Sequence, residues 1–499
     1  MNMKGGEPTS PRGAPHVALL SSPGMGHVAP VAELARRLHA EHGLTCTILT
    51  FASSDTPAQR AYLATLPPPI TTLTLPSVPL TDLLPSAGVA AIETLLSVEA
   101  QRSVPAITST LRRLKSTTRL VAYVADLFGA DTLQAARDAG GVPGFLFFPS
   151  NLLMLSLMLH LPRLHAALPA GLEFRDLPDP VTLPGCVPVP GADLLQPLQD
   201  RASDAYRWML HHAGKYRDAK GILVNTFDAA EPGAAAVFRD DEPWRPPVYP
   251  VGPVTRQTGN DGDDATGCVA WLDAQPDGSV LFVSLGSGGA LPLAQTRELA
   301  RGLEASGHRF LWVVRSPPPT PSADDQVDNN SSNPGESYYD GGGSRNGDDD
   351  PLRFLPPGFV DRTKEVGYVV PSWAPQARVL AHRTTGAMLT HCGWNSVLES
   401  VARGVPMVAW PLYAEQRQNA VMLCEETRVA LRPKVRGDGG GMVLAQDVAE
   451  VVEEVMRGEK GERARARVAE LQETARKGLQ PGGASYETLA HVVSIWRKD

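Results

Sequence analysis

His27 stands where a histidine can accept a proton. Residues 16–21 are an apolar run typical of a buried strand, a turn with Gly24 and Gly26 follows, and residues 28–38 have helical spacing. At a helix N-terminus the helix dipole disfavours an added positive charge, so a neutral imidazole can act there as a general base. The alternative is a polar residue at a helix start with no chemical role.

Asp126 follows a second apolar run, residues 120–125, at the strand edge where ligands gather in parallel sheets. A carboxylate there can hold the imidazole of His27 in one tautomer and stabilise its protonated form. Asp126 could instead cap the helix predicted from residue 129 onward, because aspartate is a favoured N-cap. Asp131 is a second, weaker candidate for the partner of His27.

A second group of polar residues, His391, Asn395 and Ser396, lies between an apolar run at 386–390 and a helical pattern. A strand that ends in such a turn at a helix start can hold phosphate, because free N–H groups and the helix dipole attract an anion. Ser396 and Glu399 also have the spacing of a capping box, in which each side chain bonds the other's backbone N–H. Both interpretations remain open.

The whole segment from residue 373 to 416 resembles, almost position for position, the signature box of plant UDP-sugar-dependent glycosyltransferases that act on small secondary metabolites. Other segments (ADLFGADTL, HLPRLH, GILVNTF, PPVYPVGP, FLPPGF) resemble the subgroup that glucosylates hydroquinone and other simple phenols. The likeness covers most of residues 15–495. It implies an α/β protein of the GT-B fold, with two facing Rossmann-like domains and an interdomain cleft.

The resemblance also implies roles for individual residues. It makes His27 the catalytic base, with Asp126 in a charge-relay role. The residues expected at the UDP-sugar are Ser287, Trp373, Ala374, Gln376, His391, Trp394, Asn395, Ser396, Glu399, Glu415 and Gln416.

Within that set, Trp373 would stack on uracil, and a core tryptophan is the alternative. The backbone of Ala374 would contact uracil, and Gln376 would lie beside it. Glu399 would hold the ribose hydroxyls, and Glu415 and Gln416 the sugar hydroxyls. Gln416 points to UDP-glucose, because relatives with this glutamine use glucose.

His391, Asn395 and Ser396 would face the phosphates, with Trp394 in the same turn. Ser287, in a second glycine turn, is a further expected phosphate contact, and a simple turn residue is the alternative. Glu415 departs from the family's more usual aspartate and differs from it in reach.

The acceptor is expected in the first half of the chain. Residues 145–155 are strongly apolar and could be core or could line an aromatic pocket. With His27, the residues expected at the acceptor are Glu93, Phe128, Phe148, Leu152 and Ala414.

The strand, glycine turn and helix pattern occurs twice. It restarts with a strand at 279–285, a helix at 295–306 and a strand at 310–315, which predicts two α/β domains. The predicted organisation is a disordered N-terminus (1–14), an acceptor domain (15–252), a linker (253–267), a UDP-sugar domain (268–482) and a C-terminal helix (483–499) that can pack on the first domain. An acidic insert, 316–350, is expected to be a solvated loop, with a ligand-gating role as the alternative.

Composition excludes several functional classes. The formal charge of −8 over 499 residues disfavours nucleic acid as a partner, and most of that charge lies in the insert. Five scattered cysteines form no CxxC pair, which argues against disulfides or zinc and for a reducing compartment. No signal peptide or membrane span is visible, so we expect a cytoplasmic monomer with no metal and no cofactor besides the co-substrate UDP-glucose.

The hypothesis is therefore an inverting glucosyltransferase that forms a β-glucoside on a small phenol. Transfer to nitrogen or carbon of an aromatic acceptor, or nucleotide-sugar binding without catalysis, are the alternatives. A nicotinamide dehydrogenase is a weaker one. The Gly24, Gly26 and Ala29 spacing fits a loose dinucleotide fingerprint, but the strand at 45–51 does not end in the acidic residue that this fingerprint requires.

Overall fold

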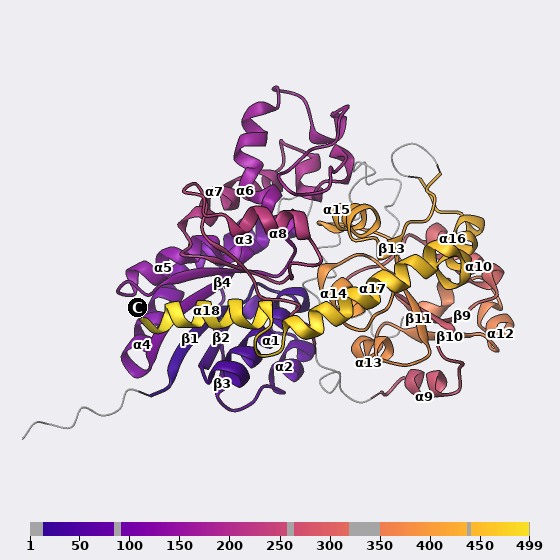
Figure 1. Ribbon diagram of the computed structural model, residues 1–499, viewed down its shortest axis with the longest axis horizontal. Coiled ribbons are helices and arrows are strands. Elements are labelled where there is room, and N and C mark those ends of the chain that lie inside the picture. Colours follow the sequence, from indigo (N-terminus) through magenta and orange to yellow (C-terminus); the bar gives the residue numbers. More distant parts are fainter. Residues whose placement is uncertain (1–12, 84–90, 257–263, 319–349, 437–440, 499) are drawn as a thin grey trace, which may run out of the picture.

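The computed structural model describes residues 13–83, 91–256, 264–318, 350–436 and 441–498. The predictions of a disordered N-terminus and of a solvated acidic insert therefore fall largely outside the described residues. Two lobes, each built on its own sheet, make up the molecule (Figure 1).

The first lobe is built on a seven-stranded parallel sheet of order β3-β2-β1-β4-β5-β6-β7. Its strands are β1 (Pro15–Leu20), β2 (Thr45–Phe51), β3 (Ile70–Leu75), β4 (Arg119–Asp126), β5 (Gly144–Phe148), β6 (Ile222–Val224) and β7 (Val248–Pro250). Side chains of β1 alternate between two separate cores, with Val17 and Leu19 in one and Ala18 and Leu20 in the other. Both faces of the sheet are thus buried, which explains the continuous apolar runs in the sequence.

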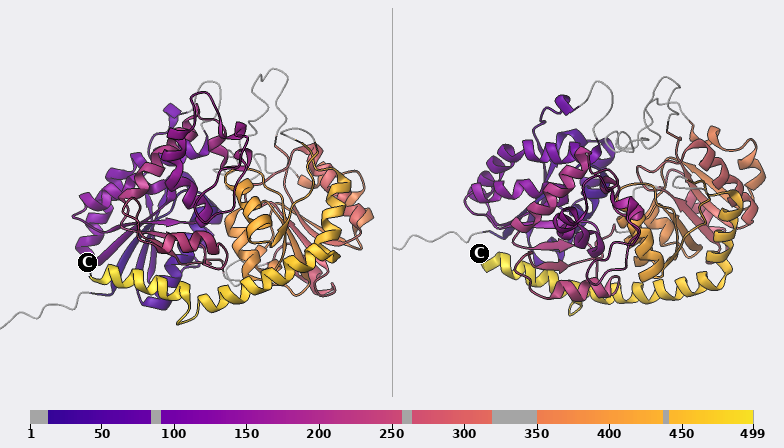
Figure 2. Two further views of the ribbon diagram at one scale, coloured as in Figure 1. Left: turned by 45° about the horizontal axis from the view of Figure 1, so that its top comes forward. Right: turned by 90° about the horizontal axis from the view of Figure 1, so that it is seen from above.

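Helices cover both faces of this sheet (Figures 1 and 2). They are α1 (Met25–His42), α2 (Pro57–Leu63), α3 (Ile92–Arg102), α4 (Val104–Thr117), α5 (Leu133–Asp138), α6 (Leu152–Ala167), α7 (Asp204–Lys215) and α8 (Pro232–Arg239), with a 3₁₀ helix, η3 (Leu127–Thr132), after β4. Helix α1 follows Gly24, whose φ of 94° is a left-handed conformation that glycine adopts at little cost.

The second lobe repeats the plan with six parallel strands in the order β10-β9-β8-β11-β12-β13. The strands are β8 (Val280–Ser284), β9 (Arg309–Val314), β10 (Gly367–Pro371), β11 (Thr385–Thr390), β12 (Met407–Ala409) and β13 (Ala430–Leu431). Its helices are α9 (Cys268–Asp273), α10 (Leu293–Ser306), α12 (Phe359–Thr363), α13 (Gln376–Leu380), α14 (Trp394–Ala402), α15 (Gln416–Val421), α16 (Ala445–Arg457) and α17 (Glu459–Gly478).

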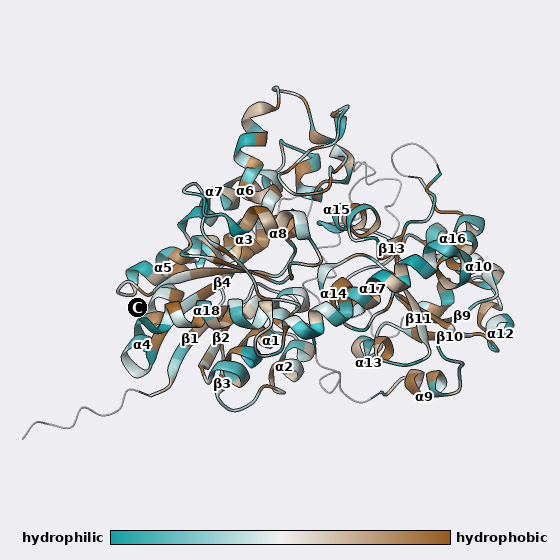
Figure 3. Cartoon of the chain, in the orientation of Figure 1, coloured by the Kyte–Doolittle hydropathy of each residue, from teal (hydrophilic) through white to brown (hydrophobic). Residues whose placement is uncertain are grey.

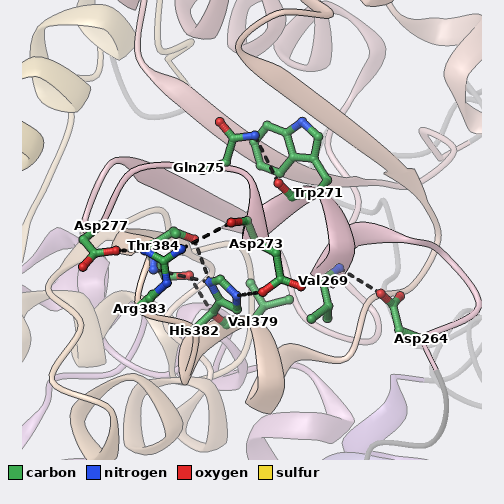
Figure 4. Close-up of polar contacts among 11 residues, drawn as sticks. Asp264, Val269, Trp271, Asp273, Gln275, Asp277, Val379, His382, Arg383 and Thr384 are labelled. Atoms are coloured by element: carbon green, nitrogen blue, oxygen red, sulfur yellow. Dashed lines mark hydrogen bonds and ion pairs between the residues drawn. The ribbon is translucent and has the colours of Figure 1, made fainter.

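Helix α9 is tied to the loop that precedes β11 (Figure 4). His382 lies between Asp273, at 3.2 Å from its Nε2, and the Thr384 hydroxyl, at 2.8 Å from its Nδ1. Arg383 pairs with Asp277. These contacts fix the beginning of the second lobe against its sheet at the edge away from the carboxyl ends of the strands.

The last helix, α18 (Ala484–Lys498), returns to the first lobe. Helices α17 and α18 form the yellow run that crosses from one lobe to the other in Figures 1 and 2. Trp496 is fully buried against Phe145 of β5, with ring centroids 5.5 Å apart, and Ser485 donates a hydrogen bond of 2.6 Å to the carbonyl of Gly252. Hydrophilic and hydrophobic residues alternate along α17, as expected for a helix that packs on one side only (Figure 3).

Strand order reverses once in each sheet, between β1 and β4 and between β8 and β11. The loops that leave these neighbouring strands diverge to opposite sides of the sheet and leave a crevice at the carboxyl edge, where open α/β sheets bind ligands. His27 and Asp126 follow or end strands at the first reversal, and Ser287 and His391 follow strands at the second.

The predicted elements lie close to those observed. The strands expected at 45–51, 120–125, 279–285 and 386–390 correspond to β2, β4, β8 and β11 within one residue at either end. The two Rossmann-like domains are confirmed, whereas the domain boundaries stay predictions. Among the described residues no helix is both long and apolar enough to cross a membrane.

Candidate functional site

A cavity of about 550 Å³ lies between the lobes, and residues of both line it. The first lobe contributes the start of α1, the start of α3, η3 and the segment before α6. The second lobe contributes the loops after β8, β10, β11 and β12. The cavity thus joins the two strand-reversal crevices.

His27 and Asp126 form a close pair at the floor of the first crevice. The Nδ1 atom of His27 lies 2.9 Å from Oδ2 of Asp126, and Asp126 is fully buried. Phe128 packs beside the ring with centroids 5.6 Å apart.

Asp126 serves as a cap as well as a histidine partner. Its Oδ1 accepts a hydrogen bond of 3.2 Å from the N–H of Phe128, at the start of η3, and its Oδ2 accepts one of 2.9 Å from the N–H of Ser22. The capped helix begins at Leu127 and not at residue 129 as predicted. The competing candidate, Asp131, contacts His211 at 2.9 Å and does not line the cavity.

The turn between β11 and α14 does not contain the capping box that the spacing allowed. Helix α14 begins at Trp394, so Ser396 is its third residue, and its N-cap is Gly393 with no side-chain cap. Instead, Gln376 of α13 donates hydrogen bonds to the hydroxyl of Ser396 at 3.0 Å and to the carboxylate of Glu399 at 2.7 Å. The first backbone N–H groups of α14 are left to face the cavity, where an anion can accept their hydrogen bonds.

His391 packs between two glycines of that crevice. A Cβ atom added to Gly286 or Gly393 would lie about 2.4 Å from the imidazole, so both positions must lack a side chain. Burial, together with the charge of Arg315, lowers the pKa of His391 to about 4. His391 is therefore neutral near pH 7 and can donate a hydrogen bond but carries no positive charge.

Two side chains of this turn reach across to the first lobe. The indole N–H of Trp394 donates to the carbonyl of Asn225 at 2.7 Å, and the amide of Asn395 donates to the carbonyl of Gly26 at 2.8 Å. Gly26 is the residue before His27, so the two crevices are joined at the site itself.

Trp373 is not a core tryptophan. Its side chain is 44% exposed and lies at the cavity wall beside Ala374, which is buried. Ser287, in the turn after β8, is also exposed toward the cavity.

The backbone is strained next to several of these residues. Ser372, Cys392 and Ala414 have φ values of 65°, 65° and 53°, in the left-handed region that non-glycine residues rarely adopt. Each is adjacent to a residue expected to bind ligand, namely Trp373, His391 and Glu415. Such strain is concentrated in proteins at sites that position side chains.

Glu415 and Gln416 lie at the start of α15 and line the cavity. The Oε1 atom of Gln416 accepts hydrogen bonds from the N–H groups of Leu412, at 2.9 Å, and Tyr413, at 3.0 Å. This fixes the amide so that its NH₂ group faces away from the backbone. Burial raises the pKa of Glu415.

The residues expected at the acceptor divide into two groups. Glu93, Phe128 and Ala414 line the cavity with His27, and burial raises the pKa of Glu93. Phe148 and Leu152 do not line it. Phe148 packs on Tyr216 in the core, and Leu152 is buried at the start of α6, where its N–H bonds Glu231. The apolar run at 145–155 is thus mostly core at these two positions.

Sequence reasoning missed Arg315 and Ser150. Both line the cavity, and the Nε of Arg315 and the Oγ of Ser150 are buried without a hydrogen-bond partner among the described residues, as are Nδ1 of His391 and Oδ1 of Asn395. Buried polar groups are normally paired, so these four atoms mark the polar part of the cavity lining. The signal for Arg315 was available, since it ends the predicted strand at 310–315.

Within the part of the chain that the structure describes, no cluster of three or more histidine, cysteine or acidic side chains has the arrangement of a metal site. The prediction that no metal takes part stays a prediction.

Comparison with known proteins agrees with the geometry. Residues 339–471 match the family model described as UDP-glucoronosyl and UDP-glucosyl transferase. The chain is 46% identical to UDP-glycosyltransferase 72B1 of Arabidopsis thaliana over 97% of its own length and 96% of that protein. It is 43% identical to hydroquinone glucosyltransferase of Rauvolfia serpentina, over 97% of this chain and 98% of that one.

A solved structure is similar along the whole chain. The Phytolacca americana UGT2 complexed with UDP-2fluoro-glucose and pterostilbene has a TM-score of 0.85 and 43% identity, and the match covers 97% of this chain and 100% of that one. A donor analogue and an aromatic compound are thus bound by a protein of the same fold. The chain has a crevice suited to phosphate, a histidine–aspartate pair and relatives that are 43–46% identical over nearly the full length. It therefore belongs to the plant UDP-glycosyltransferases of the GT-B fold and is an enzyme that transfers a glycosyl group from a UDP-sugar.

Proposed function

We propose that the protein is an inverting UDP-glucose-dependent glucosyltransferase that adds β-glucose to the hydroxyl of a small phenolic acceptor. The observation that carries this proposal is the His27–Asp126 pair, which opens onto the same cavity as the residues of segment 373–416. The names of similar proteins, one acting on hydroquinone and one bound to pterostilbene, support a phenolic acceptor.

In this proposal His27 is the general base. Because Nδ1 faces Asp126, Nε2 is the ring atom available to the acceptor. It takes the hydroxyl proton as the phenolic oxygen attacks the anomeric carbon, and the bond from that carbon to the UDP oxygen breaks on the opposite face. A single displacement inverts the configuration, and Asp126 stabilises the imidazolium that forms.

The charge that develops on UDP needs stabilisation by groups fixed in advance. The N-terminus of α14, the hydroxyl of Ser287 and the neutral imidazole of His391 supply hydrogen-bond donors. Arg315 adds the positive charge that His391 lacks, since its guanidinium lies in the same crevice with an unpaired Nε.

The remaining contacts hold the rest of the donor. Trp373 stacks on uracil beside Ala374, and Glu399, held by Gln376, binds the ribose hydroxyls. Glu415 accepts hydrogen bonds from glucose hydroxyls and the oriented NH₂ of Gln416 donates to them. A sugar that differs from glucose in the position of one hydroxyl would leave these buried groups unpaired, so the site favours UDP-glucose over other UDP-sugars.

The acceptor end of the cavity is largely apolar. Phe128, Leu96, Met154 and Met209 line it around His27. An aromatic ring fits such a wall and leaves its hydroxyl at the histidine. The cytoplasmic location and the monomeric state stay predictions.

The direct test is a panel of donors and acceptors. With UDP-glucose and simple phenols, monolignols, stilbenes or flavonoids, we expect UDP release and a β-glucoside by NMR. UDP-galactose and UDP-xylose should give much slower turnover. An α-linked product, or transfer only to nitrogen or carbon, would contradict the proposal.

Replacing the base tests the mechanism. His27→Ala should lower kcat by roughly 10²–10⁴-fold, because proton removal by a positioned base contributes about that much. UDP affinity, measured by calorimetry, should not change. His39→Ala, on the same helix and with its ring bonded to the carbonyl of Leu44, is the matched control and should keep normal turnover. Near-normal turnover of His27→Ala would rule out this mechanism.

Asp126→Asn tests the charge of that carboxylate. An asparagine has one acceptor oxygen, so it cannot accept from the N–H groups of both Phe128 and Ser22, and it cannot stabilise the imidazolium. We expect kcat to fall by about 10²-fold or more, together with a lower melting temperature because one buried N–H loses its acceptor. Asp131→Asn, which removes the negative charge beside His211 away from the cavity, is the control. Equal losses of kcat in both variants would argue against a catalytic partnership.

Arg315→Met tests the charge at the diphosphate. Removing the guanidinium should weaken UDP binding and UDP-glucose binding alike, by roughly ten- to a hundredfold, since charge-assisted hydrogen bonds contribute roughly 1.5–3 kcal/mol. Arg309→Met, at the start of the strand that Arg315 follows and bonded to Gln275, is the control. Isothermal titration with UDP and with UDP-glucose gives the two affinities, and unchanged values for Arg315→Met would exclude this role.

A further inference from the structure

Two buried asparagines form a hydrogen bond across the interface between the lobes. Asn151, from the first lobe, donates through Nδ2 to Oδ1 of Asn419 in α15 at 2.7 Å, and both side chains are fully buried. Asn419 in turn donates through its own Nδ2 to the carbonyl of Cys392 at 3.0 Å and, at a longer 3.5 Å, to Oε1 of Glu415.

The direction of this chain of hydrogen bonds is set at both ends by the backbone. The Oδ1 of Asn151 accepts from the N–H of Met154 at 2.8 Å, and an N–H can only donate. At the other end the carbonyl of Cys392 can only accept. A flip of either amide would place two donors or two acceptors against each other, so neither side chain can turn without the loss of buried hydrogen bonds.

The consequence concerns Glu415. With its Oδ1 held by Asn151, Asn419 must present its NH₂ group to the Glu415 carboxylate, which lines the cavity. One donor that faces Glu415, the amide of Asn419, thus depends on a residue of the other lobe.

We propose that Asn151 and Asn419 are positioning residues that orient Glu415 toward the transferred sugar, and that they do so only when the two lobes are closed on each other. This inference rests on the proposed function, in which Glu415 binds the glucose hydroxyls. It predicts that the lobe that binds the acceptor helps to hold the sugar of the donor.

Gln418 provides a matched comparison in the same helix. It too is fully buried and crosses the interface, since its Oε1 accepts from the N–H of Leu195 at 3.1 Å and its amide lies 3.3 Å from the sulfur of Met154. Unlike Asn419, its side chain makes no hydrogen bond to the Glu415 carboxylate within the described residues. A substitution of Gln418 therefore removes a contact between the lobes alone, whereas a substitution of Asn419 also removes the hydrogen bond to Glu415.

The test is the isosteric change Asn151→Asp. Aspartate keeps an oxygen for the N–H of Met154 but, when ionised, has no donor for Asn419, whose amide must then flip and turn its oxygen toward Glu415. We expect KM for UDP-glucose to rise about tenfold (~1.4 kcal/mol), with kcat changed by less than about threefold and the Kd for UDP unchanged. Such a pattern marks a lost contact to the sugar and not to the nucleotide.

Asn419→Ala should have the same effect, and combining it with Asn151→Asp should add little, because the two act through one contact. Asn419→Ala also serves as the test if Asn151→Asp does not fold. Gln418→Leu should lower the melting temperature but leave the ratio of the UDP-glucose and UDP dissociation constants unchanged.

Two results would overturn the proposal. One is that the ratio of the UDP-glucose and UDP dissociation constants stays unchanged in Asn151→Asp and Asn419→Ala. The other is that this ratio changes equally in Gln418→Leu. Calorimetric binding of UDP-glucose and UDP is measured without turnover. Failure of the wild-type chain to transfer glucose would therefore contradict the proposed function, whereas the binding ratio tests the asparagine pair.

Discussion

The site depends on the contact between the turn before α14 and the first lobe. Neither crevice is complete alone, because one holds the histidine–aspartate pair and the other the start of α14. The hydrogen bonds from Trp394 to Asn225 and from Asn395 to Gly26 join the two crevices at the backbone itself. A backbone acceptor cannot be displaced without moving its strand or helix, so these two bonds hold the start of α14 against the segment that carries His27.

The same contact brings two helix N-termini together. Helix α1 begins one residue before Gly26 and α14 begins one residue before Asn395, so the positive ends of both dipoles face one cavity. Neither helix has an acidic residue in its own first turn, but the buried carboxylate of Asp126 lies 2.9 Å from His27 at the start of α1. The two helix ends thus differ in local charge, with a carboxylate beside the start of α1.

Much of the fold could be predicted because its signals are local. Continuous apolar runs bounded by glycine turns are typical of parallel strands buried on both faces, and β2 was predicted to the residue. His27 and Asp126 could be paired because each lies at the carboxyl end of adjacent strands. Other features depend on tertiary contacts that no spacing encodes: the capping box failed because Gln376, from another helix, bonds both Ser396 and Glu399. Phe148 and Leu152 were misassigned for a related reason, since one apolar run serves both core and cavity and only packing decides which.

The return of α18 to the first lobe has a mechanical consequence. The backbone crosses between the lobes twice, once after β7 and once between α17 and α18. Two connections hold the lobes together more closely than a single linker does, because the C-terminal helix is itself buried against the first lobe through Trp496. Separating the lobes beyond the reach of the segment between α17 and α18 therefore requires α18 to leave the first lobe.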